Sequence, residues 1–166
     1  MSGELLIILG WLHVFFAVCW IGGAVLVAFV IEPASRRLSP QSLAEFAKRY
    51  IPLVGKFMGI ITSLTILFGA LFYYSITDGR ILTDPAGQWN LIMYAGASLG
   101  LITYVFGMVV MLPLAKRIER VSQNMGSNPS GGGRMEELMV RMSRTSLVDL
   151  ILLIAVYTLM EIATYY

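Results

Sequence analysis

A single histidine, His13, lies inside a long apolar run near the beginning of the chain. Its place in that run puts it about 12 Å from the end of a helix that rises 1.5 Å per residue. An ionisable residue inside a membrane span is a functional candidate. A neutral imidazole is also the commonest metal ligand and an axial ligand of heme. We therefore predict that His13 binds a metal, and a histidine hydrogen-bonded to a neighbouring helix is the alternative.

Methionine sulfur is the second group suited to this chemistry, because a thioether can bind Cu(I) or the sixth position of a heme iron. Among ten methionines, Met93 lies as far before Pro113 as His13 lies before Pro33, and Met160 stands near the end of the last apolar run. With heme, three arrangements are open: a five-coordinate iron, a methionine ligand from Met93 or Met160, or two copies of His13 at a dimer axis. Simple packing is the alternative role of the methionines.

Small residues share a helix face with His13 and recur in a later apolar run, where two of them form a GxxxG motif. They allow close helix packing, or they leave room for a flat ligand with Trp11, Phe16 and Trp20 as aromatic walls. The residues that complete this predicted cofactor site are Gly10, Ala17, Trp20, Gly96 and Gly100.

The composition excludes a soluble enzyme of the usual kind. The chain has 166 residues, of which 57% are hydrophobic and 13% charged, whereas soluble domains carry about 25% charged residues. The lone cysteine, Cys19, excludes an intrachain disulfide and a cysteine-cluster metal site. Nucleotide-binding and hydrolase motifs are missing from the sequence. The net charge of +2 gives no indication of a nucleic-acid partner.

The elements that must position these groups are membrane spans, since a transmembrane helix needs about 20 mostly apolar residues. We predict an all-α polytopic membrane protein with one domain of four spans, at about 5–31, 55–77, 90–114 and 144–165. Eleven of the 12 basic residues fall between spans one and two or between spans three and four. The positive-inside rule therefore predicts cytoplasmic basic loops and both termini outside, in a prokaryotic cytoplasmic (inner) membrane.

The basic loops are expected to be partly helical. Ser39 and Pro40 are a plausible N-cap and first position of a short helix over 41–50 that Pro52 ends. The third span is expected to continue past Pro113 to about residue 121, and residues 135–144 to lead directly into span four. Residues 126–134 are rich in glycine and are predicted to form a flexible linker.

Two acidic residues lie in or beside the fourth span. Asp149 stands about 7 Å inside its basic end, and we expect it to pair with a basic residue such as Lys56 or Arg36 because an unpaired carboxylate is costly there. A proton-relay role is the alternative. Glu161 lies near the outer surface and is expected to be solvated.

An internal repeat is suggested by residues 29–38 and 109–118, which align at an offset of 80. Pro33 falls on Pro113, and the basic pair Arg36 and Arg37 falls on Lys116 and Arg117. The chain then consists of two tandem helical hairpins related by an axis along the membrane normal. The alternative is that a proline followed by two basic residues is a common ending for a span.

The stretch from Trp11 to Gly23 resembles the first helix of the CopD-type copper-resistance membrane proteins and of the HemJ-type protoporphyrinogen oxidases. The similarity lies in Trp11-Leu12-His13, in Trp20 seven residues after the histidine, and in Gly22-Gly23. Resemblance to the HemJ type implies a helical bundle that binds b-type heme through His13. Resemblance to the CopD type implies copper handling.

These observations predict a b-type heme protein with its heme near the outer face and a role in redox chemistry or electron transfer. Its partners would be the lipid bilayer, a second copy in a homodimer, and a quinone or another redox partner. The alternatives are a copper-handling membrane protein, which would need a polar path that the spans lack, and an accessory subunit without a cofactor.

Overall fold

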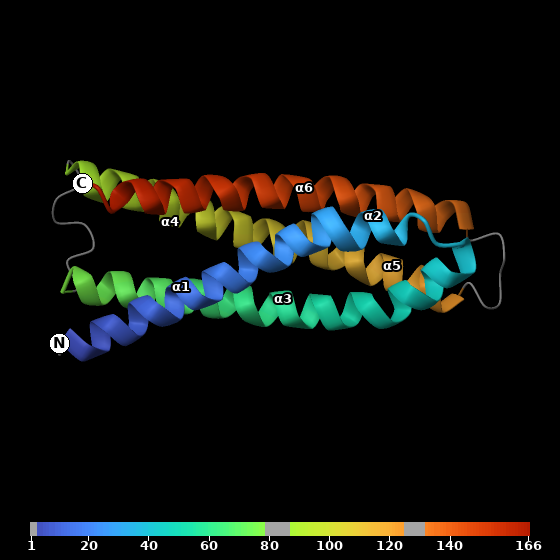
Figure 1. Ribbon diagram of the computed structural model, residues 1–166, viewed down its shortest axis with the longest axis horizontal. Helices are drawn as coiled ribbons and strands as arrows, with labels where there is room; N and C mark the ends of the chain where they lie inside the picture. Colours follow the sequence, from blue (N-terminus) through green and yellow to red (C-terminus); the bar gives the residue numbers. More distant parts are fainter. Residues whose placement is uncertain (1–2, 79–86, 125–131) are drawn as a thin grey trace. The chain divides into compact units, whose positions relative to one another are not determined.

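The computed structural model describes residues 3–78, 87–124 and 132–166, which form helices and contain no β-strand. Helix α1 (Gly3–Leu26) continues through the π-helical segment η1 (Val27–Ile31) into α2 (Glu32–Ser35). The second helical rod is α3 (Pro40–Ile76). The third consists of α4 (Gln88–Phe106), the π-helical η2 (Gly107–Met111) and α5 (Leu112–Asn124), and the fourth is α6 (Gly132–Ala163). Figure 1 shows the order of these elements along the chain.

All four rods are long and apolar enough to cross a membrane, judged by length and composition. Large apolar side chains cover their outward surfaces: Ile7, Val18 and Ile151 are 73%, 63% and 65% exposed. Such surfaces would be unstable in water but match the acyl chains of a bilayer. The fold therefore defines a multi-pass helical membrane protein, as the sequence predicts.

Each rod extends beyond its predicted span at the basic end. The predicted break at Pro52 is wrong, because α3 runs unbroken through this proline. Proline is tolerated inside such helices when neighbouring groups satisfy the freed carbonyl, and Ala47, which precedes Pro52 by five residues, is fully buried in a hydrophobic core. Residues 135–144 do lead directly into the fourth span. Of the predicted linker, 126–131 lie outside the described residues, and 132–134 form the first turn of α6.

The π-helical segments precede the two aligned prolines. Segment η1 ends two residues before Pro33, and η2 ends two residues before Pro113. Proline cannot donate a backbone hydrogen bond and its ring displaces the preceding turn, so a widened turn relieves the conflict. The two segments begin 80 residues apart, which is the offset of the sequence alignment. Both segments thus share their position relative to a proline, and the tandem-hairpin repeat stays a prediction.

The chain divides into two compact units. Unit 1 comprises Met1–Gly22, Ile60–Tyr104 and Ile151–Tyr166, and unit 2 comprises Gly23–Gly59 and Val105–Leu150. In unit 2, apolar faces of α3, α5 and α6 enclose a core, and Ser39 caps α3 as predicted, with its Oγ accepting from the Ser42 N–H. The buried residues of this core are Leu43, Ala44, Ala47, Leu114, Ile118, Met135, Met139 and Met142.

In unit 1 the helices pack through aromatic and small residues. Tyr73 of α3 stacks on Trp89 and meets Tyr94 edge-on, with ring centroids 6.1 Å apart in both pairs. On the same helix, Phe68 stacks on Phe16 of α1. All the residues of the predicted cofactor site belong to this unit.

Candidate functional site around His13

The His13 imidazole is anchored to the backbone of α3. Its Nδ1 lies 3.0 Å from the carbonyl oxygen of Thr65. A carbonyl oxygen accepts and never donates, so Nδ1 carries the proton in this bond. In the neutral ring, Nε2 then holds the lone pair. Histidine ligands of metals are commonly oriented through the other ring nitrogen in this way.

Gly69 of α3 provides the space for the ring. A methyl group added at Gly69 would lie 2.7 Å from Cε1 and 2.8 Å from Nδ1 of His13, but 3.6 Å from Nε2. The Nδ1–Cε1 edge of the ring therefore faces α3. It lies so close that any side chain at position 69 would clash with it. Nε2 is the nitrogen on the side away from Gly69. Within the described residues Nε2 has no hydrogen-bond partner.

Aromatic side chains flank the histidine along the α1–α3 contact. One turn toward the N-terminus, Gly10 lies against Phe72, whose ring would be 3.0 Å from an added methyl group. One turn in the other direction, Phe16 and Phe68 stack with centroids 5.6 Å apart. His13 is thus the polar group between two apolar aromatic contacts. A part-buried imidazole in such surroundings is shielded from competing water.

Three of the predicted site residues, Gly96, Gly100 and Met160, meet between α4 and α6. Met160 lies against Gly96, with its Cε 3.2 Å and its Sδ 3.4 Å from the position of an added methyl group. Gly100 faces Val156 at 3.6 Å. Met93 lies one turn before Gly96 and is partly exposed. These glycines therefore allow close helix packing, which is the first of the two roles expected of them.

Of the two tryptophans predicted to flank the ligand, one is buried and the other is exposed. Trp20 is 5% exposed, whereas Trp11 is 63% exposed and stacks on Phe15. Ala17 is partly exposed on the same helix. The structure therefore places Gly10 and His13 against α3, and Gly96, Gly100 and Met160 between α4 and α6.

Sequence reasoning missed the partners that α3 contributes, namely Thr65, Phe68, Gly69 and Phe72. The second span carries several glycines and aromatic residues, and its sequence does not indicate which of them face α1. A backbone carbonyl as hydrogen-bond acceptor has no sequence signal at all.

Polar groups also gather in unit 2, near the basic ends of the helices. Arg36 donates a hydrogen bond to Ser143, and Ser146 donates one to Glu32 over 2.6 Å. Asp149 is 5% exposed, and the structure gives it no ion pair among the described residues, so the expected pairing with Arg36 or Lys56 is not found there.

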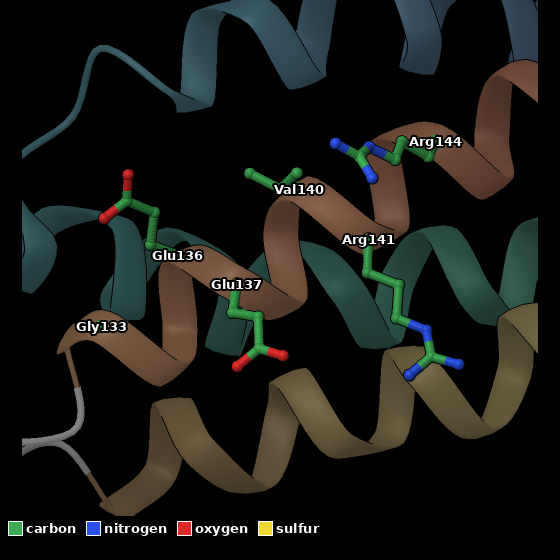
Figure 2. Close-up of a pocket in the computed structure, with 6 residues that line it drawn as sticks. All are labelled: Gly133, Glu136, Glu137, Val140, Arg141 and Arg144. Atoms are coloured by element: carbon green, nitrogen blue, oxygen red, sulfur yellow. The ribbon is translucent and has the colours of Figure 1, made fainter.

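A groove of about 610 Å³ runs along the first turns of α6, lined by two acidic and two basic side chains of that helix (Figure 2). Its lining residues are Gly133, Glu136, Glu137, Val140, Arg141 and Arg144. The groove is open, and the described residues hold no group of three or more His, Cys, Asp and Glu side chains that could bind a bare metal ion.

Comparison of the chain with family models, with curated proteins and with solved structures finds no match. The class of protein therefore rests on the fold, which is that of a multi-pass helical membrane protein. Its function has to be argued from His13 and its surroundings.

Proposed function

We propose that this chain is an integral membrane protein that binds b-type heme through Nε2 of His13. The observation that carries the proposal is the hydrogen bond from His13 Nδ1 to the Thr65 carbonyl, because it leaves the lone pair on Nε2. The chemistry of the donor set favours heme over copper. A bare copper ion needs several protein ligands, whereas heme supplies four nitrogens and needs one or two more.

The chain's own residues would have three tasks in such a site. Thr65 would hold the imidazole in one tautomer, and Gly69 would let the ring stand close to α3. Phe16 and Phe68 would keep water away from the ligand nitrogen. Bound heme would supply a reversible one-electron couple, so the proposed role is redox chemistry or electron transfer with a quinone or another redox partner.

The site is proposed to lie near the outer face of a prokaryotic cytoplasmic membrane. This placement rests on the positive-inside rule, because basic residues concentrate in the two loops at the other ends of the spans. Copper handling through His13 and a methionine is the second candidate, although the sulfur of Met160 packs against Gly96 between α4 and α6 whereas His13 packs against Gly69 of α3.

Reconstitution of the purified protein with hemin tests the proposal. We expect a Soret band with near-stoichiometric heme, and we expect His13→Ala to lose the band while its far-ultraviolet circular dichroism stays helical. Free imidazole added to His13→Ala should restore part of the band by occupying the vacated space. Full heme occupancy in His13→Ala would disprove the proposal, because the sequence offers no other histidine.

The second axial ligand can be identified separately. Met160→Ala or Met93→Ala should shift the reduced absorption bands and lower the reduction potential if that methionine binds iron, because thioether ligation raises the potential. Unchanged spectra in both variants would rule out methionine and leave a five-coordinate iron or a second His13 from a homodimer. Analytical ultracentrifugation of the heme-loaded protein distinguishes these two.

A further inference from the structure

The charged groove on α6 lies on the face of that helix that points away from the core of unit 2. Met135, Met139 and Met142 of α6 are buried in this core. Glu137 and Arg144 are exposed and stand seven residues apart, which places both on the opposite side of a helix with 3.6 residues per turn. The face that carries them is therefore accessible to molecules outside the bundle.

Three kinds of side chain follow one another along this face. Glu137 comes first, Arg141 and Arg144 follow, and then comes Val148, which is 47% exposed. Successive members are four, three and four residues apart, so they form one stripe, because residues three or four apart are neighbours on a helix. At 1.5 Å per residue, the acid and the first arginine lie about 6 Å apart along the axis. Toward the apolar span, the stripe thus presents negative charge, positive charge and an apolar surface.

The charged side chains of the groove have no ionic partner in the part of the chain that the structure describes. There, Glu136, Glu137, Arg141 and Arg144 make neither an ion pair nor a side-chain hydrogen bond. In Figure 2, the side chains of Glu137 and Arg141 project on one side of the helix, and those of Glu136 and Arg144 project on the other. Their charges are therefore available to a ligand.

The stripe lies where the polar end of α6 meets its apolar part. Helix α6 is long and apolar enough to cross a membrane, and its apolar run begins at Thr145, directly after Arg144. Arginine at such a level stands among lipid headgroups. Retention of a loop in the cytoplasm requires basic residues and does not account for the two acids. Two acids and two arginines leave the groove without net charge, which favours a zwitterionic lipid over an anionic one.

We propose that this groove binds a phospholipid with a phosphoethanolamine headgroup. In such a lipid the ammonium group lies farthest from the acyl chains, and the phosphate lies between the two. The stripe on α6 has the complementary order. The Glu137 carboxylate accepts hydrogen bonds from the ammonium, the guanidinium groups of Arg141 and Arg144 donate to the phosphate, and an acyl chain lies against Val148. The groove volume of about 610 Å³ accommodates the headgroup.

Native mass spectrometry of the delipidated full chain tests the proposal, because it counts each bound lipid by its mass. The probes are dioleoyl lipids that differ only in the headgroup. We expect phosphatidylethanolamine to bind about tenfold more tightly than phosphatidylcholine, whose nitrogen has no N–H to donate, and than phosphatidylglycerol, which has no ammonium group. Equal binding of the three lipids would overturn the proposal. So would a preference for phosphatidylglycerol, which would indicate a site for anionic lipids.

Substitutions assign the two charges of the headgroup separately. Glu137→Gln should remove the preference for phosphatidylethanolamine over phosphatidylcholine, and Arg141→Gln should weaken the binding of all three lipids. Glu45→Gln and Arg49→Gln are the matched controls, because these exposed residues of α3 have the same spacing and are not among the groove's lining residues. Controls that change lipid binding as much as the groove variants do would contradict the site.

A soluble ligand with the same charges is distinguished from a lipid by free phosphoethanolamine. It should bind far more weakly than the lipid because it has no acyl chain, and equal affinity would refute a lipid site. The comparison of headgroups uses the wild-type chain, so it decides the question even if a variant fails to fold. Heme binding by His13 is measured independently of lipid binding, so failure of either proposal leaves the other testable.

Discussion

At the residue scale, the position of the His13 ring depends on the absence of a side chain at Gly69. The Nδ1–Cε1 edge of the imidazole occupies the volume that a Cβ at position 69 would need. The hydrogen bond to Thr65 depends on this approach. A small substitution on α3 should therefore displace the His13 side chain, which belongs to α1.

We predict that Gly69→Ala displaces the imidazole and weakens heme binding by about tenfold or more, equivalent to ~1.4 kcal/mol. The measurement is a hemin titration followed at the Soret band. Gly55→Ala is the matched control, because a methyl group added at that position of the same helix meets nothing within 4 Å. Equal affinity of both variants and the wild type would show that the ring position seen here does not govern heme binding.

At the element scale, the α4–α6 contact depends on two small residues one turn apart. Gly96 and Gly100 are buried, and Met160 and Val156 lie directly over them. Without a hydrophobic driving force between helices in lipid, such contacts depend on close packing. This makes the contact sensitive to added volume.

Gly100→Leu should destabilise the helix pair by about 1–3 kcal/mol, the usual cost of overpacking. Thermal unfolding in detergent, followed by circular dichroism, measures the effect. Ala97→Leu on the same helix places a leucine on an exposed face and should leave the transition unchanged. A Gly100→Leu protein as stable as the wild type would mean that the two helices separate in the membrane.

At the scale of the whole molecule, charge asymmetry predicts orientation. Eleven of the 12 basic residues lie in the segments that connect span one to span two and span three to span four, and positively charged connecting segments are retained in the cytoplasm. Both termini should therefore face outward. Four spans, an even number, place both termini on the same side of the membrane.

A reporter that is active only outside the cytoplasm, fused after Tyr166, should be active. A cytoplasm-specific reporter at the same position should be silent, and one inserted directly after Asn124 should be active. The reverse pattern would refute the predicted topology and with it the placement of His13 near the outer face.

The all-α membrane fold was predictable from the sequence, because four apolar runs of sufficient length can satisfy their backbone groups in a bilayer only as helices. The local departures from this pattern were less accessible. Pro52 looks like a helix end in the sequence, but α3 continues through it. The π-helical segments precede Pro33 and Pro113, but Pro52 lies in an unbroken α-helix, so a proline in the sequence does not by itself predict such a segment.

For the candidate site, the sequence determined that His13 is the histidine available and that it lies inside a span. The tertiary structure decided which of its nitrogens is free, because the Thr65 carbonyl belongs to a different helix. It likewise decided that Gly69 faces the ring and that Glu32 lies buried beside Ser146. The physical reason is that helix periodicity specifies which residues share a face, whereas the rotation of one helix against its neighbour depends on packing between distant segments.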